Sequence, residues 1–505
     1  MSIFNNAALL IAVPLLFAFS IPLFGFVSKQ LTKWVALFTI GFNATFSLYI
    51  LLAHKYPTVV VMGNWVPPFG ENLYIGPVAA FLVSVISLIG LLIAIYNLWA
   101  IKLGDVTRFS VLFLMFIAGA SGMVLTGDIF NLFIFMEITG VSSYALVAYG
   151  PRRRALGGAF KFLVVSSIGS TLYLLGVMLI YTQLGTLNIA EIAARINQTT
   201  PGLLTFAGIL LISGLAVEAE LFPFNGWVPD TYTGAVNGIS AALSGVGAIA
   251  GVYALFRIVM TVLGRDGTYV FTYGKLDLMT VVAILATATV IIGELSALVQ
   301  KNVKKMLAYS SMAQMGLVAA GFSIGSKLGV YGGIFQLVNH SIAKSMLFLI
   351  VGVLVGSGLG ERIEDFKGLW RRSPFLSLAF TIGAFSMLGF PLFAGFWSKF
   401  AIVGASIQRG GWYDFVIGLI LFASVVEAFY YLRIVTYIFS STSIKEPKIR
   451  VNLSPAIPIF ILAVVIVAIG IYPNFIGSFS MQSAGEFTHK MTGYVLNVIP
   501  TIAAH

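Results

Sequence analysis

Long apolar runs, joined by short segments that hold most of the charged residues, make up nearly the whole chain. A helix needs about 20 mainly apolar residues to cross a hydrocarbon core of about 30 Å. Fourteen runs reach this length, so the pattern predicts an all-α polytopic membrane protein with about fourteen membrane-spanning helices. The predicted spans lie near residues 7–27, 31–53, 75–100, 108–126, 129–149, 158–183, 203–222, 235–262, 279–299, 306–325, 330–357, 376–407, 412–440 and 454–478.

The first run lacks the basic start and the small-residue cleavage site of a signal peptide, so we count it as a helix. Lys and Arg accumulate in cytoplasmic loops, so their distribution orients the bundle. One side of the membrane carries Lys55, Arg195, Arg265, Lys275, Lys327, Arg409 and Lys490. The other carries Lys29, Lys33, Lys102, Arg108, Arg152, Arg153, Arg154, Lys301, Lys304, Lys305, Arg362, Lys367, Arg371, Arg372, Lys445, Lys448 and Arg450. The richer set predicts the cytoplasmic face, with both termini outside the cell membrane.

Four motifs recur in the same order at an offset of about 168–176 residues. LVAYG returns as LVAAG, GGAF and SSIGSTLYLLG as GGIF and HSIAKSMLFLIVG, FPFNGW as FPLFAGFW, and LFRIV as YLRIV. Each unit contains five predicted helices, and an odd number reverses orientation in the membrane. The sequence therefore predicts two inverted repeats, helices 4–8 and 9–13. The predicted units are 1–107, 108–262, 279–440 and 454–505, the last holding helix 14 and a tail.

Prolines interrupt helices 7 and 12 at equivalent places in the two predicted repeats, at Phe222-Pro223 and at Gly389-Phe390-Pro391. A proline removes a backbone hydrogen bond, and inside a bilayer the freed carbonyl must be satisfied by protein or by cavity water. Each break is therefore either a packing kink or the wall of a hydrated channel. Interrupted helices at matching positions of inverted repeats are typical of transport pathways, which favours the second interpretation.

The composition excludes a water-soluble enzyme, because 59% of the residues are hydrophobic and 9% are charged. The chain has no cysteine, so it cannot form a disulfide, a thiolate iron–sulfur cluster or a cysteine zinc site. We expect no cofactor or metal on this chain, and any redox centre must belong to another polypeptide. We attribute the net charge of +11 to membrane topology and expect no nucleic-acid partner.

Charged side chains within the predicted spans are the candidates for function, because a charge at mid-bilayer costs at least about 2.5–3.5 kcal/mol. The candidates are Glu137, Glu218, Glu220, Glu294, His340, Lys344, Lys399 and Glu427. Acid, imidazole and amine groups in a partly hydrated interior can relay protons.

Simpler roles are open for several of these charges. Glu220 could cap or solvate the break, and Glu294 and Glu427 could each form a structural ion pair. His340 and Lys344, one helical turn apart, could be a buried hydrogen-bonded pair. Lys161, Arg257 and Arg433 lie near span ends and could reach the headgroups.

Several motifs resemble the antiporter-like subunits of respiratory complex I, Mrp sodium/proton antiporters and membrane-bound hydrogenases. They are Glu137 with FPFNGWVPD (222–230), VKKMLAYSSMAQMG (303–316), NHSIAKSMLFL (339–349) and GFPLFAGFWSKF (389–400). The resemblance covers about helices 4–13 and implies fourteen helices with two inverted five-helix repeats. It assigns ion translocation to Glu137 in helix 5, Lys399 in helix 12, and His340 and Lys344 in helix 11. It also matches Pro223 and Pro391 to the family's helix breaks.

The chain departs from this family in its first half. The usual helix 7 lysine is Glu218, the usual helix 8 lysine is Ile249, and the histidine after the helix 7 proline is Asn225. The Glu–Lys pair of the first half-channel is therefore missing. Either the path uses carboxylates, with a sodium site as one option, or this half does not conduct in the usual way. Glu137, Glu218, His340, Lys344 and Lys399 are thus the predicted translocation residues, supported by Glu220, Glu294, Glu427, Pro223 and Pro391.

The resemblance implies a proton- or sodium/proton-translocating subunit of a multi-subunit membrane complex, coupled to a redox module. Its expected partners are other antiporter-like and small hydrophobic subunits, an iron–sulfur peripheral arm, protons and sodium. The short segment after helix 14 is more similar to the Mrp D-type and hydrogenase-type subunits. An Mrp D-type subunit without redox partners, a stand-alone solute carrier and a scaffold that has lost transport are the alternatives.

Overall fold

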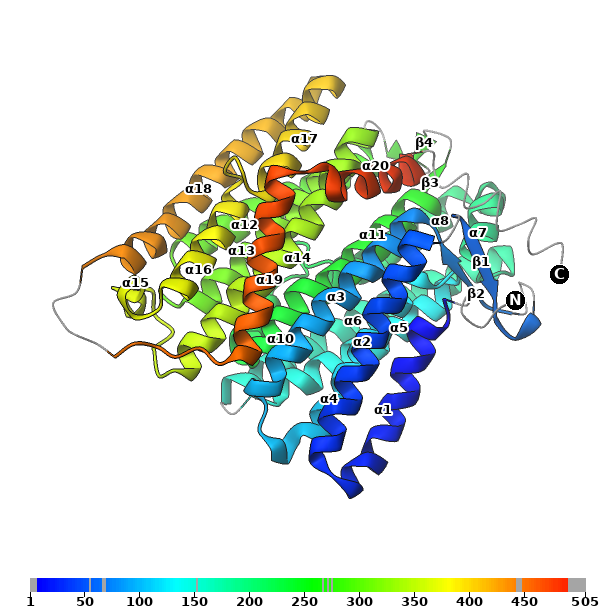
Figure 1. The fold of residues 1–505 in the computed structure, drawn as a ribbon. Coiled ribbons are helices and arrows are strands. Elements are labelled where there is room, and N and C mark those ends of the chain that lie inside the picture. Colours follow the sequence, from blue (N-terminus) through cyan, green and yellow to red (C-terminus); the bar gives the residue numbers. More distant parts are fainter. Residues whose placement is uncertain are drawn as a thin grey trace.

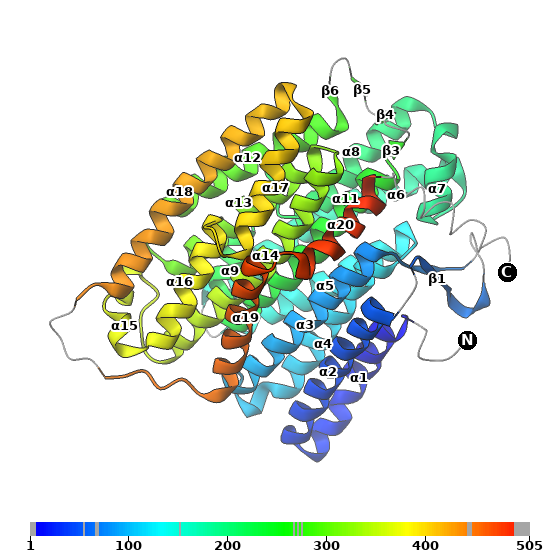
Figure 2. The same cartoon turned by 45° about the horizontal axis from the view of Figure 1, so that its top comes forward.

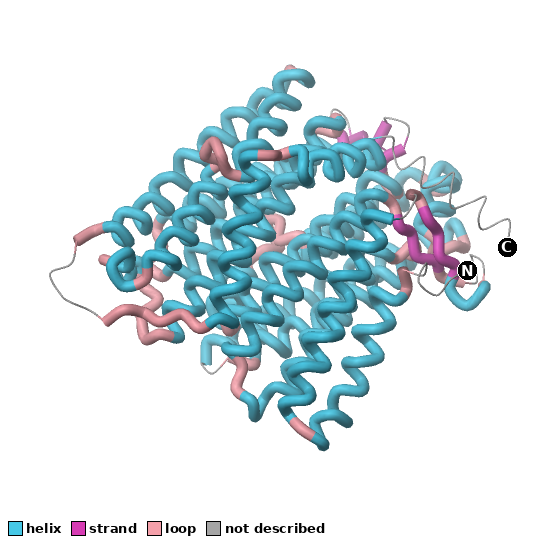
Figure 3. The backbone as a smooth tube through the Cα atoms, in the orientation of Figure 1, coloured by secondary structure: helices cyan, strands magenta, loops and turns pink. Residues whose placement is uncertain are grey.

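The computed structural model describes residues 7–53, 56–65, 70–150, 153–265, 268–269, 272–273, 276–441 and 447–488. Within these ranges the chain is a bundle of helices, and the short strands lie at one end of it (Figure 3). The tail beyond Thr488 lies outside the described residues, as do five residues of the charge argument: Lys55, Arg152, Lys275, Lys445 and Lys490.

The helices follow one another closely along the chain (Figures 1 and 2). They are α1 (Leu9–Val27), α2 (Lys29–Ala53), α3 (Pro77–Ala100), α4 (Val106–Leu125), α5 (Ile129–Ala148), α6 (Arg153–Leu184), α7 (Ile189–Arg195), α8 (Pro201–Glu218), α9 (Val228–Gly234), α10 (Asn237–Ala242), α11 (Ala248–Thr261), α12 (Leu278–Leu298), α13 (Val303–Ser323), α14 (Lys327–Gly356), α15 (Leu369–Arg372), α16 (Pro374–Leu388), α17 (Ala394–Arg409), α18 (Asp414–Phe439), α19 (Leu453–Ile471) and α20 (Asn474–Thr488).

The strands form three antiparallel hairpins. They are β1 (Thr58–Val61) with β2 (Asn72–Ile75), β3 (Gly264–Arg265) with β4 (Thr268–Tyr269), and β5 (Thr272–Tyr273) with β6 (Leu276–Asp277).

The prediction of an all-α polytopic membrane protein is confirmed, although the structure divides the spans differently. Twelve helices among the described residues are long and apolar enough to cross a membrane. The predicted span 306–325 is α13, which has 21 residues but begins with two lysines and is more polar. The predicted span 376–407 is the pair α16 and α17, each too short to count alone because the chain breaks between them.

Both predicted breaks are present, and a third irregularity was not predicted. The chain leaves helical geometry between α8 and α9 and between α16 and α17, where Gly389 ends α16 with a φ of 77°. Between α10 and α11 lies a π-helical segment, Leu243–Gly247. Such segments inside helices occur frequently at functional sites.

Two short backbone contacts have equivalent places in the two five-helix series. Asp128 caps α5 and pairs with Asn188, after α6, whereas Asn302 caps α13 and pairs with Arg362, after α14. Together with the two broken helices, these contacts support the inverted repeat, whose detailed symmetry stays a prediction.

The C-terminal helix α20 lies across the bundle (Figures 1 and 2) and contacts α14, α3 and α11. Its Glu486 accepts a hydrogen bond from the backbone N–H of Val78 at 3.1 Å. A Cβ at Gly76 would overlap an oxygen of this carboxylate, so a larger residue there would displace the Glu486 side chain. Burial raises the pKa of Glu486 above its ordinary value.

Candidate functional site

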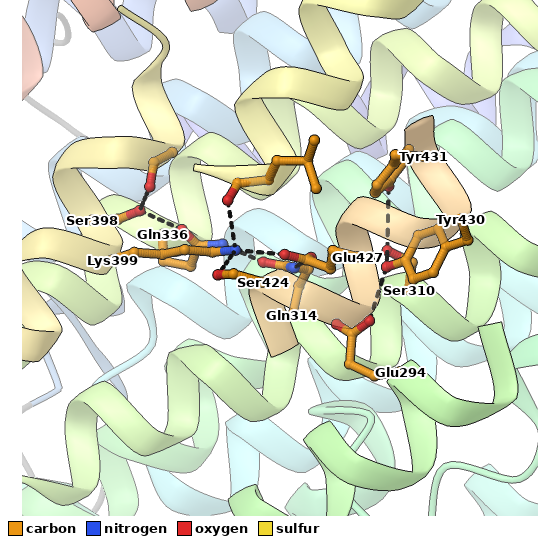
Figure 4. A network of polar contacts seen from close by, with 12 residues as sticks. Glu294, Ser310, Gln314, Gln336, Ser398, Lys399, Ser424, Glu427, Tyr430 and Tyr431 are labelled. Carbon is orange, nitrogen blue, oxygen red and sulfur yellow. Dashed lines mark hydrogen bonds and ion pairs between the residues drawn. The ribbon is translucent and has the colours of Figure 1, made fainter. Parts of the chain in front are cut away.

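The second half of the chain contains a buried ion pair between the predicted residues Lys399 and Glu427. The Lys399 ammonium on α17 lies 2.5 Å from the Glu427 carboxylate on α18 (Figure 4). It also donates to the hydroxyl of Ser424 at 3.1 Å and to the carbonyl of Leu388 at 3.3 Å. Leu388 is the last residue of α16, so the break supplies an acceptor for the buried lysine. Glu427 therefore has the cation partner that the sequence analysis considered for it.

A row of neutral polar side chains continues from the other oxygen of Glu427. Gln314 on α13 donates to this oxygen, Gln336 on α14 donates to Gln314, and Ser398 on α17 donates to Gln336 (Figure 4). All of these side chains are buried. Both carboxylate oxygens are thus hydrogen-bonded, which is how a protein makes a buried charge tolerable.

A second row connects Glu294 on α12 to Lys344 on α14. The Tyr430 hydroxyl donates to Glu294 at 3.0 Å and lies 2.9 Å from the hydroxyl of Ser310. Ser310 in turn lies 3.2 Å from the Tyr431 hydroxyl, which accepts a hydrogen bond from the Lys344 ammonium at 3.0 Å. Among the described residues Glu294 has no ion pair, but it interacts electrostatically with Glu427, Lys399 and Lys344. The two rows therefore belong to one electrostatic cluster.

His340 and Lys344 do not bond to each other, contrary to the simpler alternative. The His340 Nε2 lies 3.2 Å from the hydroxyl of Ser244, in the π-helical segment, and Ser244 lies 3.0 Å from Ser311. The other ring nitrogen of His340 is buried without a hydrogen-bond partner among the described residues. One ring nitrogen of His340 thus contacts the first half, and the other has no partner among the described residues.

Glu220 lies inside the first break and links the two halves. Its φ of 58° is in the left-handed region, and its side chain is only 2% exposed. One carboxylate oxygen accepts a hydrogen bond from the Tyr232 hydroxyl of α9, and the other has no partner among the described residues. Glu220 interacts electrostatically with Lys344 on one side and Glu218 on the other. Because Glu220 is this deeply buried, its role is not to solvate the break.

In the first half Glu137 and Glu218 interact with each other, and neither forms an ion pair with a described residue. The two carboxylates interact electrostatically, and both are partly exposed. The hydroxyl of Ser166 on α6 donates to Glu218 at 2.8 Å. In the described part of the chain Glu137 has no hydrogen bond or ion pair, and Ile249 is packed in the apolar core. The Glu–Lys pair is absent among the described residues, as expected from the sequence, and two carboxyl groups interact in its place.

One carbonyl beside each break accepts a hydrogen bond from a side chain. The Trp227 indole donates to the carbonyl of Val217 at 3.3 Å, and Lys399 donates to that of Leu388. Pro223 and Pro391 themselves are exposed on the outside of the bundle. The breaks thus offer backbone acceptors to side chains, and a hydrated channel beside them stays a prediction.

Three further cations, considered above for the headgroup region, have different surroundings. Lys161 forms a half-exposed ion pair with Asp230 at 2.8 Å. The idea that Arg257 reaches the headgroups is wrong, because it is buried, faces the rings of Tyr74 and Tyr253, and donates to a carbonyl of α4. Arg433 is partly buried.

The sequence analysis missed the neutral residues of this network, because it selected candidates by their charge. A positional signal did exist, because Gln336, His340 and Lys344 follow one another at intervals of four on α14 and so share one helix face. Among the described residues, no three His, Asp or Glu side chains are placed to hold a metal ion.

Comparisons with known proteins agree with this geometry. The family described as "NADH:quinone oxidoreductase/Mrp antiporter, TM" matches residues 126–426. A chain of the membrane-bound sulfane sulfur reductase, "an archaeal respiratory membrane complex", is 39% identical with a TM-score of 0.90, over 97% of this chain and 99% of that one.

Two curated relatives are each 29% identical. The NADH-quinone oxidoreductase subunit N of Desulforudis audaxviator aligns over 92% of this chain and 97% of its own length. The D-type subunit of the Na(+)/H(+) antiporter of Alkalihalophilus pseudofirmus aligns over 88% of both chains. The family match covers more than half of the residues, includes both breaks and most of the polar network, and agrees with the observed fold. This chain therefore belongs to the NADH:quinone oxidoreductase/Mrp antiporter family of transmembrane subunits.

Proposed function

We propose that this chain is the ion-translocating, antiporter-like subunit of a multi-subunit complex in the cell membrane, and that it moves protons or exchanges sodium for protons. We assign the path to Glu137, Glu218, His340, Lys344 and Lys399. Glu220, Glu294 and Glu427 support it as groups that accept or stabilise charge between them. The basic loops favour an orientation with both termini outside.

The observation that carries this proposal is the row of polar groups across the bundle, partly exposed at its first pair and buried beyond it. It begins at the Glu137–Glu218 pair, passes Glu220 and Lys344, and reaches Glu294 and the Lys399–Glu427 pair. Buried ionisable side chains within a membrane domain are costly, and they commonly mark an ion or proton path. A stand-alone carrier of organic solutes would not need such a row.

Coupling to a redox module is the version that we favour. The 39% identical chain belongs to a reductase described as a respiratory complex. Because this chain has no cysteine, electron transfer would require other subunits. A D-type subunit of an Mrp antiporter, without redox partners, is the second candidate, and the 29% identity to such a protein supports it.

Purification from the native membrane in mild detergent, with mass spectrometry and an iron assay, distinguishes these versions. We expect stoichiometric iron–sulfur subunits in the co-purified complex. Small hydrophobic partners without iron would instead indicate the Mrp type. A chain that elutes alone would revive the solute-carrier alternative.

Ion flux in vesicles containing the complex tests the path itself. We expect Glu137→Gln and Lys399→Ala to abolish ion movement while the complex still assembles. The matched controls Glu364→Gln and Lys367→Ala change exposed side chains and should leave flux unchanged. Wild-type flux in both path variants would contradict the proposal.

A further inference from the structure

A charged pocket opens where the two five-helix series meet, away from the buried network. It has a volume of about 750 Å³. One wall comes from the start of α6 and from α9, and the other from the α12–α13 connection and the segment after α14. Its charged lining residues are Arg154, Asp230, Lys301, Lys305, Glu361 and Arg362.

The charges of this pocket favour an anion. Four of the six charged lining residues are cationic, and one of the two acids, Asp230, is already paired with Lys161. Among the described residues, the side chains of Arg154, Lys301 and Lys305 have no hydrogen bond or ion pair. Two long helices, α6 and α13, also begin at this pocket, and the positive ends of their dipoles add to its potential. A phosphate group is the chemistry that best suits several cationic side chains at helix starts.

The neighbouring surface indicates that this phosphate belongs to a lipid. Directly along α6 from the pocket, Leu156 and Phe160 are 62% and 69% exposed, and Val299 at the end of α12 is 71% exposed. The pocket is therefore at the level where spans end, next to apolar faces that acyl chains can cover. Basic pockets between transmembrane helices on the cytoplasmic side are known to hold anionic headgroups.

We propose that this pocket binds the headgroup of an anionic phospholipid, whose acyl chains lie on the exposed faces of α6 and α12. The lipid then contacts both five-helix series at the surface that the basic loops predict to be cytoplasmic. Such a ligand reduces the repulsion among Arg154, Lys301 and Lys305 and holds the two series together at this end. The site is distinct from the buried path, so it does not depend on which ion moves.

The test is lipid retention by the purified complex in nanodiscs that contain equal amounts of phosphatidylglycerol and phosphatidylcholine, measured by native mass spectrometry. We expect the wild-type complex to retain phosphatidylglycerol selectively. Each lysine near an anionic surface contributes a factor of roughly five, so Lys301→Gln with Lys305→Gln should weaken retention roughly 30-fold. The matched control, Lys367→Gln with Arg371→Gln, removes two exposed charges outside the pocket and should retain lipid normally.

Equal retention by the wild type and the Lys301/Lys305 variant would overturn the proposal, and so would an equal loss in the control. A second measurement separates the sources of phosphate, because a bound headgroup protects Lys301 and Lys305 from acetylation. We expect protection in phosphatidylglycerol nanodiscs and none from inorganic phosphate in phosphatidylcholine nanodiscs. Protection by inorganic phosphate would assign the pocket to a free anion and overturn the lipid site. Neither measurement reads ion flux, so failure here leaves the proposed function standing.

Discussion

The two halves of the polar network stabilise their ionisable side chains in different ways. In the second half, Lys399 and Glu427 neutralise each other and every oxygen of the pair is hydrogen-bonded. In the first half, Glu137 and Glu218 have no cation, and only Glu218 has a hydrogen bond from a described residue. The second pair is buried, whereas the first remains partly exposed.

This difference follows from what burial demands. A buried charge needs an opposite charge and hydrogen bonds, whereas a partly exposed carboxylate can be solvated or protonated. The repeat alignment shows the same contrast, because SSIGS in α6 stands where HSIAK stands in α14. Ser166 and Ser170 therefore occupy the positions of His340 and Lys344. The first half has serine hydroxyls where the second half has an imidazole and an amine.

The largest expected effect comes from breaking the Lys399–Glu427 pair. Either Lys399→Ala or Glu427→Ala leaves an unpaired buried charge and should cost about 3–5 kcal/mol of unfolding free energy. The double variant should cost much less than the sum, because no charge remains unpaired. Denaturant unfolding in detergent measures this, and simple additivity of the two losses would show that the pair is not coupled.

The caps of α5 and α13 offer the next test, because Asp128 can titrate and its counterpart Asn302 cannot. Burial raises the pKa of Asp128 from 3.8 to about 6. The nearby Glu71 also raises this pKa, whereas hydrogen bonds from two backbone N–H groups lower it. Asp128 therefore favours the folded state below about pH 4, and this contribution is lost as the pH rises through about 6. Asp128→Asn keeps the cap, so its stability relative to the wild type should rise over this range, by at most about 3 kcal/mol.

Unfolding as a function of pH checks this expectation, with the exposed Asp105→Asn as the control. Parallel pH profiles for Asp128→Asn and the wild type would mean that Asp128 has no raised pKa in the folded protein.

Glu220, which links the two halves, has one hydrogen-bond donor among the described residues, the hydroxyl of Tyr232. Tyr232→Phe removes the donor to Glu220 and leaves both of its oxygens without a partner in the described structure. An unsatisfied buried acceptor costs about 1–3 kcal/mol, so we expect a loss of this size together with slower ion flux. The control is Tyr181→Phe, which changes an exposed tyrosine of α6. Unchanged flux in Tyr232→Phe would separate Glu220 from the path.

The smallest effect on stability is expected at Glu137. Since it has no hydrogen bond or ion pair with the described residues, Glu137→Gln should change the free energy of unfolding by less than about 0.5 kcal/mol. Removing one of two like charges could even raise stability slightly. The same unfolding assay measures it, and a loss comparable to that of Lys399→Ala would reveal a structural partner for this carboxylate.

Much of the fold could be predicted because the bilayer imposes simple rules on sequence. Apolar length predicts spans, and prolines at matching places of the two predicted repeats predict breaks, which the structure shows at Pro223 and Pro391. Pro14, Pro22 and Pro458, by contrast, lie inside the continuous helices α1 and α19. The substitution of Glu218 for a lysine was visible only through the resemblance to the family. The rules on apolar length and proline missed the π-helical segment Leu243–Gly247, because no proline or charge marks it.

The sequence by itself determined where the spans lie, where two of them break, and which charges are placed in the membrane. Only the tertiary structure decided the partners: Glu294 with Tyr430, Lys344 with Tyr431, and Glu427 with both Lys399 and Gln314. These partners lie on different helices, and which helix faces meet depends on packing over the whole bundle. Serine, glutamine and tyrosine are also common in helices, so only their position beside a buried charge gives them a role.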